Sequence, residues 1–104
     1  MKEIIRDNLN YFMEHHAEVY DAYVNYGRLV HADGPLDPKT IALLKVVISS
    51  VAEHDFALTT HLRKGLAAGL TREEMEHAIL LTAPSVGFPN MMESLLILRD
   101  LLDD

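Results

Sequence analysis

The chain has 104 residues, a length at which one hydrophobic core is usual. Because 49% of the residues are hydrophobic and 24% are charged, we exclude a disordered chain and expect one packed domain over residues 1–104. Nine basic and sixteen acidic residues give a net charge of -7, which repels phosphate backbones and argues against a nucleic-acid partner. The absence of cysteine excludes disulfides, thiol catalysis and cysteine-ligated zinc.

The start of the chain carries no targeting signal that we recognise. In MKEIIRDNLN, charged residues interrupt the apolar run that a signal peptide needs. The most apolar segment, residues 41–52, is shorter than the roughly 20 residues that cross a bilayer. We therefore expect a cytoplasmic protein without membrane contact.

The first third of the chain has the apolar spacing of helices. Ile5, Leu9 and Phe12 recur at i, i+4 and i+7, which predicts a helix over residues 2–14. A second apolar stripe predicts a helix over residues 17–31, and the two helices could form one bent rod. Gly and Pro within residues 32–35 then predict a loop.

The middle of the chain predicts a central pair of helices. Asp37 is a good N-cap and Pro38 suits the first helical position, so a helix begins there and extends to about residue 52. Its few polar residues indicate burial on most sides. The short break that follows predicts a tight reversal into an antiparallel helix over residues 55–68, ending at Gly69.

The next helix has a complete start signal. Thr71 is predicted to be the N-cap and Glu74, at the third helical position, to complete a capping box. The helix stops before Pro84, and a loop over residues 84–89 leads to a last helix over about 90–102. The sequence thus predicts an all-α fold of six helices without a sheet.

The last helix is apolar over a face too wide for one neighbour, which includes Met92, Leu95, Leu96 and Leu102. So much apolar surface on a small domain predicts that a second copy covers part of it, in a homo-oligomer. The acidic residues that follow, among them Asp103 and Asp104, are unfavourable at the negative end of a helix dipole. We expect this tail to fray.

Four short motifs lie at characteristic positions in residues 36–89. They are the opening LDPK at 36–39, HLR at 61–63, GLTREEM at 69–75 and GFP at 87–89. With this combination the chain resembles the carboxymuconolactone decarboxylase and alkyl hydroperoxidase D (AhpD-like) superfamily. The resemblance implies a six-helix orthogonal bundle and a dimer-based ring of three or six chains.

The peroxidase branch of this superfamily uses a Cys-x-x-Cys pair followed by a histidine, with a glutamate one helix earlier. The two cysteine positions correspond here to His54 and Ala57, and the glutamate position to about Ala42. Only the histidine, His61, remains. Without a dithiol the chain cannot reduce a peroxide by this chemistry, and we expect no cofactor.

The decarboxylase branch is the closer one, because His61 to Gly65 resembles its His-x-x-x-Ala motif, with Gly65 in place of alanine. This resemblance implies action on a small carboxylated lactone or related acid, with His61 as general acid and base. We expect His61 to face an apolar pocket bounded by its helix, the central helix and residues 84–89. His54 would lie at the mouth, and Arg63 or Lys64 would help to attract the anionic substrate. The alternative is that both are ordinary solvated surface residues.

Plainer interpretations of these residues remain open. His61 could be a core histidine that bonds a backbone carbonyl, and His54 a helix-capping residue. The two histidines lie two helical turns apart, about 10 Å, which is too far for a shared ion, so no metal is expected. The alternative function is a non-catalytic or ligand-binding oligomer that has kept the fold and lost the chemistry.

Overall fold

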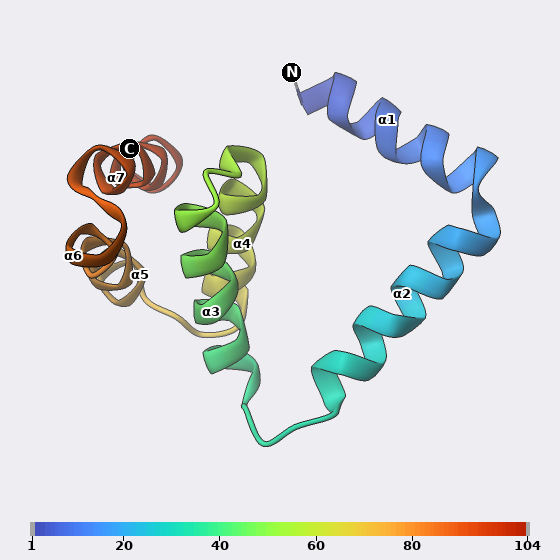
Figure 1. The fold of residues 1–104 in the computed structure, drawn as a ribbon, viewed down its shortest axis with the longest axis horizontal. Helices are drawn as coiled ribbons and strands as arrows, with labels where there is room; N and C mark the ends of the chain where they lie inside the picture. The colour runs from blue at the N-terminus through green and yellow to red at the C-terminus, as the bar shows by residue number, and fades with distance from the viewer. Residues whose placement is uncertain (1, 104) are drawn as a thin grey trace. The chain divides into compact units, whose positions relative to one another are not determined.

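The computed structural model describes residues 2–103, and all regular structure in that range is helical (Figure 1). The six predicted helices are all present, and a short helical turn, α6, begins just before the predicted loop at residues 84–89 and extends into it. The bounds are α1 (Lys2–His15), α2 (Ala17–Ala32), α3 (Pro38–Val51), α4 (Asp55–Ala67), α5 (Arg72–Leu80), α6 (Ala83–Val86) and α7 (Phe88–Leu102).

The chain divides into two units, residues 1–35 and 36–104. The first unit consists of α1 and α2, and no side chain in residues 3–35 is buried. The two helices meet at their junction, where the rings of Phe12 and Tyr20 pack edge to face with centroids 6.0 Å apart. This unit is a pair of helices joined at a bend, without a core of its own (Figure 1).

The hydrophobic core lies in the second unit. Its fully buried side chains come from four helices, and they are Val46, Leu58, Leu62, Met75, Ile79 and Leu98. The expectation of one hydrophobic core is thus confirmed, and this core lies in residues 36–104. The expectation that residues 1–104 form one domain stays a prediction.

The reversal between α3 and α4 is as tight as the sequence predicted. The backbone N–H of Glu53 donates to the carbonyl of Ser50 at 3.2 Å, and that of His54 donates to the carbonyl of Ser49 at 3.0 Å. This pattern ends a helix with one left-handed residue, and here Glu53 takes that role with φ of 59°. The turn brings α4 back antiparallel to α3.

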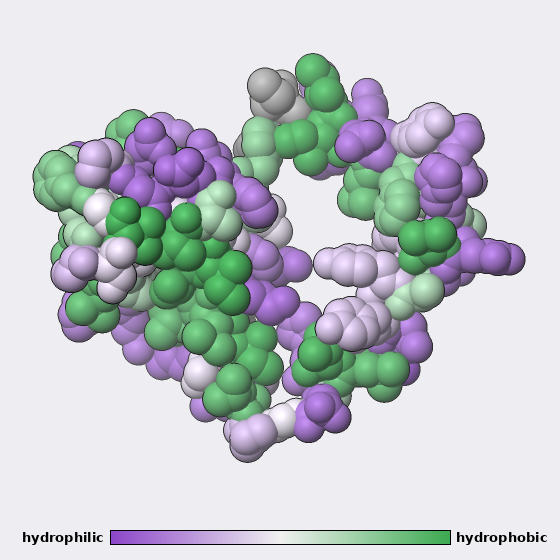
Figure 2. Space-filling view, viewed as in Figure 1, coloured by the Kyte–Doolittle hydropathy of each residue, from purple (hydrophilic) through white to green (hydrophobic). Residues whose placement is uncertain are grey.

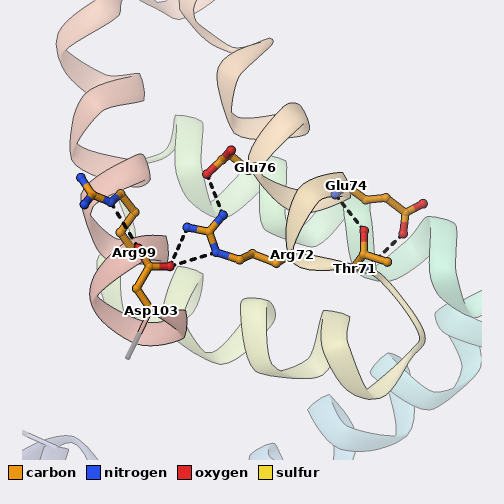
Figure 3. Close-up of polar contacts among 6 residues, drawn as sticks. All are labelled: Thr71, Arg72, Glu74, Glu76, Arg99 and Asp103. Carbon is orange, nitrogen blue, oxygen red and sulfur yellow. Dashed lines mark hydrogen bonds and ion pairs between the residues drawn. The ribbon is translucent and has the colours of Figure 1, made fainter.

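The α4–α5 connection uses the signals read from the sequence. Gly69 has a φ of 100°, and the N–H of Leu70 donates to the carbonyl of Gly65 at 2.9 Å. The capping box is complete (Figure 3), because the Glu74 N–H donates to Thr71 Oγ1 at 3.0 Å and the Thr71 N–H to Glu74 Oε1 at 2.9 Å.

A buried polar contact joins the end of α3 to the start of α7. The hydroxyls of Ser50 and Ser94 lie 2.6 Å apart, and both side chains are almost fully buried. Asn90 Nδ2 donates to the Ser50 carbonyl at 3.1 Å, so this carbonyl accepts both a backbone and a side-chain donor. These bonds set where α7 crosses α3.

The prediction that the acidic tail frays is wrong for Asp103. Its carboxylate lies 2.6 Å from Arg72 Nη2 and 3.3 Å from Arg99 Nε, while Arg72 also contacts Glu76 at 3.0 Å (Figure 3). Hydrogen bonding to Arg72 lowers the pKa of the Asp103 carboxyl. The cations offset the unfavourable helix dipole, and Asp104 lies outside the described residues.

Large apolar side chains remain exposed on the second unit. On α3 they include Leu44 and Ile48, and on α7 Met92 and Leu96. Figure 2 shows hydrophobic surface gathered over α3. Two other members of the apolar face predicted on the last helix pack against the core instead, namely Leu95 and Leu102. Within residues 2–103, no helix has the length and apolar character needed to cross a membrane.

Candidate functional site

His61 lies in the middle of α4, at the edge of the helix face that enters the core. Its neighbours Leu58 and Leu62 are buried, with 1% and 0% of their surface exposed. The imidazole itself is half-buried. This position combines an apolar flank with access from solvent, which a titratable group needs for acid and base chemistry.

The antiparallel geometry places Lys45 of α3 at the same level as His61. Lys45 comes eight residues before Glu53 in the α3–α4 turn, and His61 comes eight residues after it. Lys64 follows His61 by three residues and therefore lies on the same side of α4. Two lysines thus flank one histidine.

The surroundings of His61 favour its neutral form. Burial lowers the pKa of His61, and the positive charges of Lys64 and Lys45 lower it further. The two charges that shift the pKa of His61 come from α4 itself and from α3. Helices α5 and α7 also pack against α4, but their described residues contribute no charge that shifts this pKa. At neutral pH the imidazole is therefore largely neutral, with one nitrogen free to accept a proton.

The other predicted site residues lie away from this cluster. His54 is the N-cap of α4, where its side chain makes no capping hydrogen bond, and it is exposed. It lies two helical turns, or about 10 Å along the axis, from His61. Arg63 is exposed and lies about 200° around α4 from His61, on the opposite side of the helix. Lys64, one residue later, lies on the same side as His61.

Of the three positions that carry redox residues in the peroxidase branch, one holds His54 and the other two hold alanine, which is inert. Ala42 is buried on α3 and Ala57 is half-buried on α4, one turn before His61. In the part of the chain that the structure describes, no group of three or more histidine or acidic side chains is arranged to hold a metal ion. The chemistry available at this position is that of an imidazole and two amines.

Sequence reasoning missed Lys45 as a member of the site. Its signal was present, because Lys45 is the only charged residue of α3 after Lys39. The second signal was the position of Lys45 relative to the α3–α4 turn, because Lys45 and His61 are the same number of residues from it. Periodicity within one helix does not show such a pairing, since the contact depends on how two helices align.

The fold and this cluster define an all-α bundle with a single half-buried histidine beside lysines, without cysteine. The sequence model of the carboxymuconolactone decarboxylase family matches residues 17–100, which is most of the chain. The chain belongs to this family. The match includes α2 and residues 36–100 of the core unit.

One curated relative is similar over part of its length. It is an uncharacterized protein, number 4 in the cox locus of Paracoccus denitrificans, with 30% identity over 67 residues. The aligned region is 64% of this chain and 60% of the relative, so this chain spans about three fifths of that protein's length. No solved structure gave a significant match.

Proposed function

We propose that the protein is a decarboxylase that acts on a small carboxylated lactone or a related acid, with His61 as general acid and base. Membership of the carboxymuconolactone decarboxylase family supports the reaction class. The observation that carries the proposal is the half-buried imidazole of His61, whose neutral form is favoured by burial and by two lysines.

The reaction requires delivery of one proton to carbon, which His61 can supply. The bond between the ring carbon and the carboxylate breaks, carbon dioxide leaves, and the electron pair is taken up by the lactone carbonyl as an enolate. His61 first takes a proton from solvent and then delivers it to the carbon, so the net change is the replacement of carbon dioxide by a proton. A lowered pKa makes the imidazolium a stronger acid than free histidine.

Turnover of a carboxylated muconolactone, followed as release of carbon dioxide, tests this role. We expect His61→Gln to lower kcat/KM by about 100-fold or more, the usual contribution of a general acid or base. His77→Gln, at an exposed histidine of α5, is the matched control and should retain activity. Unchanged turnover in His61→Gln would contradict the proposal.

The same proposal includes assembly into a homo-oligomer in the cytoplasm, a dimer-based trimer or hexamer, with the small acid as the ligand. It is supported by the exposed apolar residues of α3 and α7, Leu44, Ile48, Met92 and Leu96. Sedimentation at micromolar concentration should give a species of several chains. A single species near 11.7 kDa would contradict assembly and leave these side chains unexplained.

A further inference from the structure

We propose that Lys45 binds the carboxylate of the anionic substrate and holds it beside His61. This inference rests on the proposed function and adds to it a residue and a ligand class. It rests on three features of Lys45, which are its apolar setting, its lack of an acidic partner and its level along α3.

The setting of Lys45 is unusual for a lysine. The residue is half-buried on α3, next to Leu44. One turn away on the helix lie the apolar residues Ile41, Ala42 and Ile48, together with the small polar residue Ser49. The aliphatic part of a lysine packs on apolar surface while its ammonium group faces the edge of that surface. A carboxylate bound there would pair with the ammonium group next to apolar side chains.

No residue that the structure describes supplies the anion. Among the described side chains, Lys45 and Lys64 have no carboxylate within 4.0 Å. Lys39, also on α3, is different, since its Nζ lies 3.4 Å from Glu74 Oε2. In a chain with a net charge of -7, two unpaired lysines on either side of one histidine form a local positive site.

The geometry also defines the ligand. An anion held by Lys45 lies at the level of His61, because the two residues are equally far from the α3–α4 turn. The apolar side chains next to Lys45 suit an uncharged ring or chain on the same ligand. The site therefore fits a small acid with one carboxylate and an otherwise uncharged body.

Binding of a stable lactone acid, 5-oxotetrahydrofuran-2-carboxylate, tests the inference. In the intact protein, NMR signals of the His61 ring should shift with the added acid and stay unshifted with γ-butyrolactone, which lacks the carboxylate. We expect Lys45→Met to weaken the acid's binding about 10-fold or more, while Lys39→Met leaves it within about twofold. Equal weakening by both variants, or none by Lys45→Met, would overturn the inference.

A second readout does not depend on the ligand. In the free protein, Lys45→Met should raise the pKa of the His61 ring, because one of the two positive charges acting on it is removed. An unchanged His61 pKa in a folded Lys45→Met protein would place the lysine away from the histidine and overturn the inference. If the acid binds in a Lys45-dependent way but the protein releases no carbon dioxide from a carboxylated muconolactone, only the proposed decarboxylase function is contradicted.

Discussion

The two units of the molecule have similar sequence patterns and different interiors. The α1–α2 pair carries apolar residues at helical spacing, as α3–α7 do, yet no side chain in residues 3–35 is buried. In residues 36–104, five helices contribute or pack against one core. An amphipathic stripe therefore predicts a helix, whereas burial depends on how many helices meet.

The largest expected difference between the units concerns deletion of a leucine side chain. Leu62→Ala, at the centre of the core, should lower the free energy of unfolding by about 2–5 kcal/mol, because it leaves a cavity. Leu29→Ala on α2, where the side chain is 52% exposed, should cost less than about 1 kcal/mol. Urea unfolding of dilute protein measures both. Equal losses would mean that the α1–α2 pair is buried against another surface.

Alanine at a helical glycine should have opposite effects in the two units. At Gly65 of α4 an added Cβ would lie 2.7 Å from Met75 Sδ and 3.0 Å from Leu70 Cδ1, so we expect Gly65→Ala to destabilise by about 1–3 kcal/mol. At Gly27 of α2 nothing lies within 4 Å, and Gly27→Ala should stabilise by about 0.5–1 kcal/mol. Thermal melts of the two variants should shift in opposite directions, and shifts of the same sign would contradict this packing.

Ser50 and Ser94 form a buried polar contact within the second unit. Ser50→Ala alone should cost about 1–3 kcal/mol, because it leaves the Ser94 hydroxyl buried without its partner. The double variant Ser50→Ala/Ser94→Ala should cost less than the sum of the two single variants. A double-mutant cycle in denaturant measures this coupling, and strict additivity would show that the hydroxyls do not interact.

A smaller effect of opposite sign is expected at the α3–α4 turn. Glu53 occupies the left-handed region, which costs an ordinary residue about 1–2 kcal/mol relative to the right-handed one. Glu53→Gly should therefore stabilise the second unit, by up to about 1 kcal/mol after the entropy of glycine in the unfolded chain is included. A loss of stability would mean that the Glu53 side chain contributes more than its backbone strain costs.

The pH dependence of stability should separate His61 from the acidic residues. Because the pKa of His61 is lower in the folded protein, the unfolded chain takes up its proton first, near the usual value of about 6.5. The contribution of His61 to stability is fully present above its pKa in the unfolded chain, and it is lost as the pH falls through its pKa in the folded protein. Three carboxyls also have a lowered pKa in the folded protein, namely Asp37, Glu74 and Asp103. Their contribution to stability is lost at lower pH, below about 4. His61→Gln should flatten only the upper part of the unfolding profile.

Local signals in the sequence were sufficient for the helices and their ends. Gly69, Thr71 and Glu74 act through neighbours within a few residues, so their roles follow from spacing alone. The Ser50–Ser94 pair and the Arg72–Asp103 ion pair join residues 44 and 31 positions apart, and no local pattern predicts them. The same holds for Lys45, which becomes part of the site only through the alignment of α3 with α4.

The most direct test of the His61 site is the pKa of its ring in the intact, ligand-free protein, measured by NMR and assigned with His61→Gln. A half-buried imidazole beside Lys45 and Lys64 should titrate below the usual value of about 6.5. A value at or above 6.5 would mean that the ring is solvated or paired with an acid. That result would contradict the positive, partly apolar setting on which the proposed chemistry depends.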